Sequence, residues 1–126
     1  MTKPLSSGRN HAERRPNRLF TADEFEWLVA KVCPYYHVTR EELFARFKGN
    51  VTGNMAYAAR QVVLHIAWSS YDAGYDEVAM HFNTPKTTAF KAVKQVEEWR
   101  SDHPKLDAFC TSIENEIIAR RIATNG

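Results

Sequence analysis

The sequence predicts an all-α fold, a compact bundle of about six helices, and three observations support this prediction. No window of the 126 residues alternates apolar and polar side chains with a period of two over more than a few positions. Apolar residues instead recur at helical spacing along most of the chain. Two Thr-x-x-Glu capping boxes, which begin at Thr21 and Thr39, mark the starts of helices. The length suits a single domain with one core.

The first half of the chain predicts three helices. The first begins at residue 22, with Phe20 and Phe25 at the positions of a hydrophobic staple, and Pro34 is expected to end or kink it. The second follows Thr39 and runs to about Phe47, after which residues 48–54 predict a loop. The third spans 55–70, with Arg60, Gln61 and Leu64 flanking a buried stripe made of Ala59, Val62, Val63, Ile66 and Ala67.

The second half predicts a short helix, a tight turn and two longer helices. The short helix lies within 75–82, and the turn follows at 83–85, where Thr84 is expected as N-cap and Pro85 as the first helical residue. The next helix runs to about Arg100, and residues 101–104 break it. A last helix over 105–122 is expected to bury Leu106, Phe109, Ile113 and Ile117. A short helix, a turn and a longer helix over 75–100 are typical of a helix-turn-helix.

The charge is distributed unevenly. Residues 1–19 carry five basic side chains and one acidic side chain, whereas the rest of the chain carries 12 basic and 14 acidic ones. With little to bury, this segment predicts a disordered basic tail ahead of one domain over 20–126. No apolar run is long enough for a membrane span or a signal peptide, and Cys33 and Cys110 form no CxxC pair. We therefore expect a cytoplasmic, nucleoid-associated protein with reduced, buried cysteines.

The helix that starts at Pro85 carries the clearest functional pattern. Three lysines and no acid occur between 84 and 95. Thr87, Lys91 and Lys94 share one face with Lys86 at its tip, and the opposite face is apolar. A positive face at a helix N-terminus suits phosphates and base edges in the major groove. A solvated lysine face is the alternative interpretation.

Other constellations favour structural roles. The five histidines have no metal-ligand spacing, and we expect His65 and His81 to be partly buried or on the surface. No nucleophile, base and acid occur in a catalytic pattern, so the sequence predicts no enzyme, no metal, no cofactor and no small-molecule substrate. Trp68 and Trp99 have the spacing of core residues, whereas an exposed Trp27 would indicate a protein interface.

Three segments resemble motifs of a known family, and they occur along the chain in the same order as in that family. They are residues 35–43 (YYHVTREEL), residues 59–67 (ARQVVLHIA), and residues 77–82 with 86–98 (EVAMHF and KTTAFKAVKQVEE). Together they make residues 28–100 similar to the C-terminal DNA-binding domain of the bacterial replication initiator DnaA, with 105–122 as an additional helix. No GxxxxGK[ST] motif occurs, so the initiator's ATPase activity is not expected.

The resemblance implies roles for individual residues. Arg60 occupies the position of an arginine that enters the minor groove, and Thr87 and Thr88 occupy those of paired threonines that meet the major groove and the backbone. Lys94 matches a basic position on the same helix. Pro85-Lys86 replaces an Asp-His pair, so a different target sequence is expected. The loop between the second and third helices is longer and poorer in arginine, which leaves Arg46 and Lys48 as its phosphate contacts.

These observations predict sequence-specific binding of double-stranded DNA without catalysis, in transcriptional regulation or replication. The DNA-binding residues would be Arg46, Lys48, Arg60, Lys86, Thr87, Thr88, Lys91 and Lys94. The alternative is an adaptor or anti-repressor that uses the same scaffold to bind a protein. The sequence leaves open whether the chain forms a homodimer.

Overall fold

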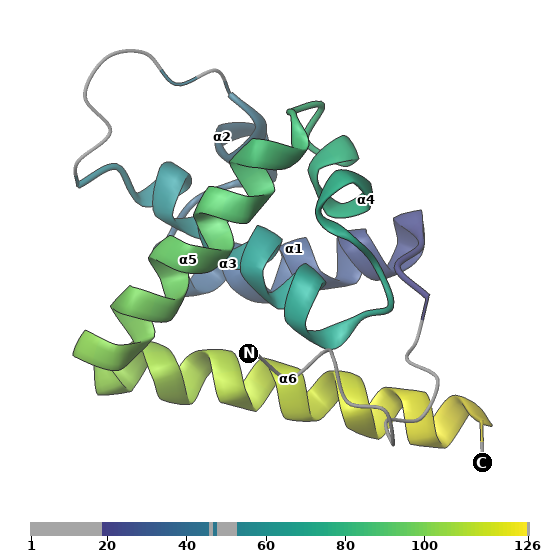
Figure 1. Cartoon of the computed structure of the whole chain (residues 1–126). Coiled ribbons are helices and arrows are strands. Elements are labelled where there is room, and N and C mark those ends of the chain that lie inside the picture. The colour runs from purple at the N-terminus through teal and green to yellow at the C-terminus, as the bar shows by residue number, and fades with distance from the viewer. Residues whose placement is uncertain (1–18, 46, 48–52, 126) are drawn as a thin grey trace.

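The computed structural model describes residues 19–45, 47 and 53–125, and every regular element in that part of the chain is a helix. The all-α prediction is therefore confirmed (Figure 1). The six helices of the described residues are α1 (Ala22–Tyr36), α2 (Arg40–Phe44), α3 (Met55–Ser70), α4 (Tyr75–Met80), α5 (Lys86–Asp102) and α6 (Pro104–Asn125). None of them is both long enough and apolar enough to cross a membrane. Apart from Leu19, the basic tail predicted for residues 1–19 lies outside the described residues.

The central element is α3, which packs against α1, α2, α4, α5 and α6. The predicted stripe of α3 is fully buried, as expected, from Ala59 to Ala67. Gln61 and Leu64, predicted to flank that stripe, are also buried, with 4% and 0% of their surface exposed. That expectation was wrong because a helix covered from several directions has almost no solvent-facing side.

The start of α1 follows the predicted capping chemistry. Thr21 accepts a hydrogen bond from the backbone N–H of Glu24 at 3.2 Å, and the rings of Phe20 and Phe25 meet edge to face at 6.0 Å. The end of α1 differs, because the helix passes Pro34 and stops at Tyr36. His37 then adopts a left-handed conformation (φ 58°), and its N–H reaches the carbonyls of Cys33 and Pro34. A proline this close to a helix end removes only one backbone donor, so the final turn still closes.

The capping box of α2 forms completely, but the helix is shorter than predicted. Thr39 Oγ1 accepts from the Glu42 N–H at 3.0 Å, while Glu42 Oε1 accepts from the Thr39 N–H at 2.8 Å. The helix ends at Phe44 rather than near Phe47, because Ala45 is extended (φ −66°, ψ 151°).

The turn between α4 and α5 is displaced by one residue from the prediction. Asn83 is left-handed (φ 55°), and the hydroxyl of Thr84 donates to the carbonyl of Ala79 at 3.3 Å. With Thr84 turned back toward α4, Pro85 is the N-cap of α5, and Lys86 is the first helical residue. A proline suits this position because no helical hydrogen bond is required of its nitrogen.

The junction of α5 and α6 is tighter than the predicted break at 101–104. Helix α5 continues to Asp102, so His103 alone separates it from α6. The His103 N–H donates to the carbonyl of Trp99 at 2.8 Å, and the His103 carbonyl accepts from the Asp107 N–H at 3.0 Å. One residue thereby closes the first helix and opens the second.

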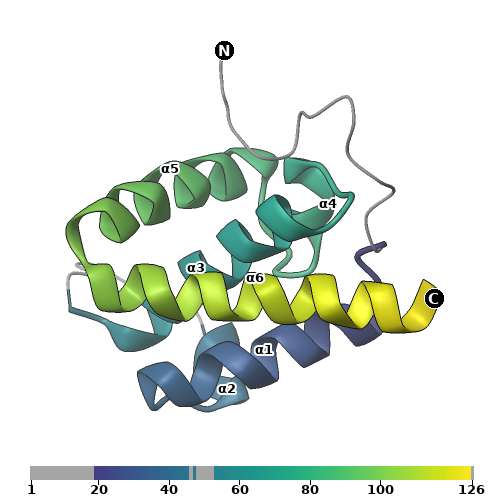
Figure 2. The same ribbon diagram turned by 90° about the horizontal axis from the view of Figure 1, so that it is seen from below.

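Helix α6 crosses the underside of the domain between α1 and α5, as Figure 2 shows. Its inward residues Leu106, Cys110, Ile113 and Ile117 are buried, and Phe109 is partly buried. Arg100 ties α6 to α5 by donating to Glu114 at 3.0 Å, to Asp107 at 2.7 Å and to Thr111 at 3.0 Å. Only 17% of the Arg100 side chain and 21% of the Glu114 side chain are exposed, so this pair is shielded from solvent, whereas Asp107 lies at the surface with 51% exposed.

The Arg100 cluster should contribute strongly to stability. Arg100→Met leaves the Glu114 carboxylate without its cation, and we expect the free energy of unfolding to fall by about 3 kcal/mol in urea titrations. Lys31→Met is the matched control, because it breaks the exposed Lys31–Glu116 pair and should cost less than about 1 kcal/mol. Equal losses in the two variants would contradict the shielding described for Arg100.

Candidate nucleic-acid interface

The buried face of α5 fixes which of its residues meet solvent. The side toward α3 and α4 consists of Ala89, Ala92, Val93 and Val96, all of them buried. Small side chains let the helix axes approach closely. Four of them within eight residues fix the rotation of α5 about its own axis, because only this side can be buried. The predicted apolar side of this helix is thus confirmed, with Trp99 partly buried at its end.

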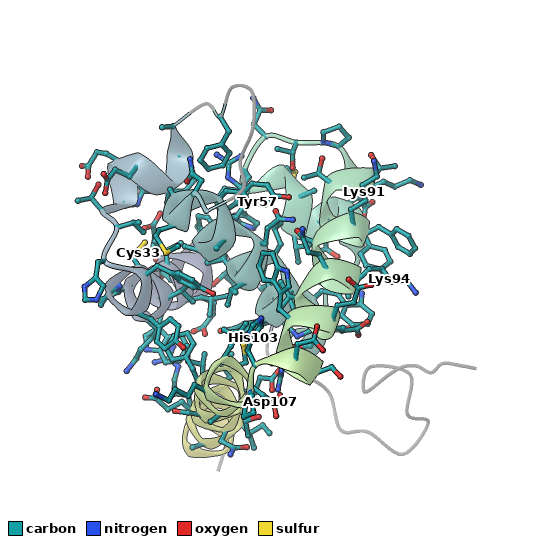
Figure 3. All side chains as sticks on the ribbon, turned by 90° about the vertical axis from the view of Figure 1, so that its left-hand side faces the viewer. Cys33, Tyr57, Lys91, Lys94, His103 and Asp107 are labelled. Carbon is teal, nitrogen blue, oxygen red and sulfur yellow. The ribbon has the colours of Figure 1, made fainter. Side chains whose placement is uncertain are left out.

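The opposite side of α5 is solvent-facing and positive in its first half. Lys86, Thr87, Lys91 and Lys94 are exposed, whereas Thr88 is only partly so. Figure 3 shows Lys91 and Lys94 pointing outward from α5, away from the rest of the domain. No acidic residue precedes Glu97 on this helix. The three lysines therefore form a cation-only surface, which we name the lysine face and define as Lys86, Thr87, Lys91 and Lys94.

The N-terminus of α5 adds to this positive surface. Its N-cap, Pro85, makes no side-chain hydrogen bond to the first turn. Backbone N–H groups in the first turn of a helix carry partial positive charge and donate hydrogen bonds to anions, phosphate in particular. The lysine face and the helix N-terminus thus reinforce each other.

Arg60, which the resemblance implies in a minor groove, is hydrogen-bonded between α2 and α3. Its guanidinium donates to the carbonyl of Leu43 at 3.0 Å and to that of Ala45 at 2.9 Å. It also lies 4.2 Å from the ring centre of Phe47, and burial lowers its pKa. These contacts occupy the unpaired carbonyls at the end of α2, so Arg60 joins α2 to α3 within the fold. Because its guanidinium is engaged in these contacts, we expect Arg60 to act within the fold rather than in a groove.

Arg46 and Lys48, the other expected phosphate contacts, lie outside the described residues. The structure instead adds two residues that the sequence reasoning missed. Phe90 and Met80 are large apolar side chains with 45% and 67% of their surface exposed. Phe90 lies beside the lysine face, with Lys94 Nζ 5.6 Å from its ring centre and Tyr75 at 5.4 Å. The sequence did contain a signal for Phe90, because residues four apart on a helix lie on the same face and Phe90 is four residues before Lys94.

The aromatic residues singled out in the sequence pack mainly within the fold. Trp27 is only partly buried, and the guanidinium of Arg120 lies 4.2 Å from its ring centre. The Trp68 ring stacks on Tyr75 at 5.4 Å. Trp27 is therefore not the exposed tryptophan that would have indicated a protein interface.

The described cysteines and histidines form no group that could hold a metal ion. Cys33 and Cys110 are both buried with free thiols, as predicted, and burial raises the pKa of Cys110 to about 12. Among the described residues, no three His, Cys, Asp or Glu side chains gather where they could hold a metal ion.

His65 is more deeply buried than expected, with only 3% of its surface exposed. Arg100 donates to its Nε2 at 3.0 Å, and because arginine is only a donor, the proton of the neutral ring lies on Nδ1. Burial, followed by the charge of Arg100, lowers the pKa of His65 to about 3. The ring is therefore a neutral acceptor within the core.

Arg60→Gln tests the position of that arginine. Loss of its charged hydrogen bonds to two carbonyls should lower the free energy of unfolding by about 2 kcal/mol, measured in urea. DNA affinity of the folded variant should change little. A variant of unchanged stability that loses affinity for DNA would place Arg60 in a groove.

His65 makes stability depend on pH with a defined sign. The unfolded chain protonates His65 near its ordinary pKa of 6.5, whereas the folded chain keeps it neutral down to about 3. The unfolded state thus binds more protons in this window, so stability falls as pH falls. The histidine should cost about 1 kcal/mol between pH 6.5 and 5.5. Burial also lowers the pKa of His81, so some loss of stability is expected in both proteins. Urea titrations at both pH values should show a loss about 1 kcal/mol larger in the parent than in His65→Gln, and equal losses would contradict the assignment.

Comparison with known proteins adds no family assignment. No family model matches the chain, and no curated protein matches it.

Proposed function

We propose that the protein binds double-stranded DNA through α5 and reads sequence without catalysing a reaction. The observation that carries this proposal is the lysine face, where three lysines and one threonine are exposed together on the N-terminal half of one helix. Lysines at such a surface neutralise phosphates, and this neutralisation supplies most of the affinity of non-specific DNA binding.

The dimensions of α5 suit a major groove. The residues from Lys86 to Lys94 extend about 14 Å along the helix axis, and the groove of B-form DNA admits an α-helix. The preceding helix α4 and the turn at 81–85 pack against α5 in the order typical of a helix-turn-helix. This order of elements is a reason for proposing a helix-turn-helix.

Individual roles follow from exposure. Thr87 is exposed near the helix tip, where its hydroxyl or methyl group can contact a base edge. Lys91 and Lys94 lie one and two turns further along, where they can follow a phosphate backbone. Thr88 is partly buried, which suits a contact with the backbone rather than with a base.

Glu97 and Glu98 limit the interface to the first half of α5. Both carboxylates are exposed, and they would repel phosphates from the second half of the helix. The helix is therefore expected to enter the groove by its N-terminus rather than lie along it.

The second candidate function is a protein-binding adaptor, and the exposed Phe90 and Met80 favour it. Large apolar side chains that are exposed to solvent are more typical of protein interfaces than of phosphate contacts. An adaptor would not show the salt-dependent affinity for duplex DNA that a DNA-binding protein shows.

Selection from a random duplex library, at near-physiological salt, tests both candidates with the full chain. An enriched motif supports the proposal, and the symmetry of that motif reports whether one or two copies bind. Salt-dependent retention of duplexes without an enriched motif would contradict the proposal that the protein recognises a specific DNA sequence. Absence of retention would favour the adaptor.

Single substitutions should separate the two kinds of DNA contact. Thr87→Ala should reduce the preference for the selected site over a scrambled one by about 1–3 kcal/mol. Lys91→Ala should weaken both duplexes alike and reduce the salt slope by about 1. Fluorescence anisotropy at several salt concentrations measures both effects. Lys31→Ala is the matched loss of one charge, on α1, and should leave both affinities unchanged; a Lys91→Ala variant that behaves like it would refute the lysine face.

A further inference from the structure

The domain contains a cleft that the proposed DNA interface does not use. It has a volume of about 570 Å³ and lies where the end of α1, the start of α3, the second half of α5 and the start of α6 meet. In Figure 3, Tyr57 and His103 lie on the face toward the viewer, while Lys91 and Lys94 point away to one side. The residues lining the cleft include Tyr36, Met55, Tyr57, Ala58, Trp99 and Leu106.

The walls of the cleft are mainly aromatic and apolar. Tyr36 and Trp99 are partly buried against the core, and Leu106 is buried. The flat faces of such rings favour a planar apolar body, through stacking and through the release of water from apolar surface. A volume of this size falls within the range of small-molecule sites, roughly 300–1,000 Å³.

A hydrogen-bonded group in one wall is fixed in orientation. Gln95 Oε1 accepts from the hydroxyl of Tyr57 at 3.1 Å and from Nε2 of the buried Gln61 at 2.9 Å. With its oxygen engaged twice, the group that Gln95 has left to offer a ligand is its Nε2 donor. The wall therefore favours a ligand that carries an acceptor.

Apart from the tyrosines, the ionisable side chains that line the cleft, among the described residues, are all basic. Lys105 and His103 line it, and no aspartate or glutamate does so among the described lining residues. Asp107 is nearby in sequence, but its carboxylate is taken by Arg100 at 2.7 Å. A lysine without an opposing acid in the cleft complements a negative charge on the occupant.

We propose that this cleft binds a small organic anion with a planar apolar body, an aromatic carboxylate by chemical class. The rings hold the body, while Lys105 and the amide of Gln95 meet the carboxylate. The site stands independently of DNA binding, because none of the residues of the lysine face lines it.

The test compares 2-naphthoate with neutral 2-naphthamide in NMR titrations of the full chain without DNA. Naphthoate should shift the signals of the Trp99 indole and of the Tyr57 and Lys105 backbone saturably, and it should leave Trp68 unmoved. Its affinity should exceed that of the amide about five-fold, as expected for one partly exposed charge pair. Failure to shift these signals at millimolar ligand, or equal affinities for the two probes, would overturn the proposal.

Variants assign the contacts. Lys105→Gln should abolish the preference for naphthoate while retaining binding of both probes. Ala58→Phe should fill the cleft and remove binding of both. Lys91→Gln removes the same charge from the outer face of α5 and should change neither affinity. If Lys105→Gln and Lys91→Gln behave alike, the cleft is not the site.

Met55→Asp is a second test that does not depend on core packing, because 50% of the surface of Met55 is exposed. An aspartate at the first position of α3 is compatible with the helix and places a negative charge in the lining of the cleft. It should weaken naphthoate about five-fold and leave naphthamide nearly unchanged. An equal effect on both probes would overturn the proposed recognition of charge.

Discussion

The burial of α3 is the constraint on which the rest of the structure depends. A helix covered from several directions cannot leave its polar side chains to water, so each of them requires a partner from a neighbouring helix. Gln61 finds Gln95 on α5, His65 finds Arg100 on the same helix, and Arg60 finds the carbonyls that end α2. These contacts determine which helix lies beside which part of α3. Apolar packing alone would be less selective, because apolar side chains do not require particular partners. The placement of α5, and with it the lysine face, follows from this constraint.

The charges on α5 give that helix a direction. Its first half presents lysines and an N-terminus that receives no side-chain hydrogen bond from its N-cap, and its second half presents Glu97 and Glu98. The helix dipole has the same polarity, positive at the beginning and negative at the end. Toward a polyanion, such a helix is attractive at one end and repulsive at the other. An approach by the N-terminus is thus favoured before any specific contact forms.

Local rules predicted most of the fold, and long-range contacts account for what they missed. The starts of α1, α2 and α3 and the buried face of α5 follow from short motifs, since caps and helical spacing involve neighbours within a turn. The shift from Thr84 to Pro85 arose because Thr84 reaches back to Ala79, and the depth of His65 depends on helices 35 or more residues away. For the candidate site, the exposure of the lysines could be predicted from spacing. The tie between Arg60 and Leu43 could not, because nothing in either segment encodes their proximity.

The single-residue junction at His103 has a consequence for the energetics of recognition. Because one residue joins α5 to α6 and Arg100 bonds across their junction, we expect the two helices to move as one rigid unit. The conformational entropy of ordering α5 is therefore lost on folding, before any partner arrives. A partner that contacts the outer side of this unit meets a surface already in its bound shape, so little of the interaction energy is spent on ordering the protein. Discrimination between partners then rests on the contacts themselves.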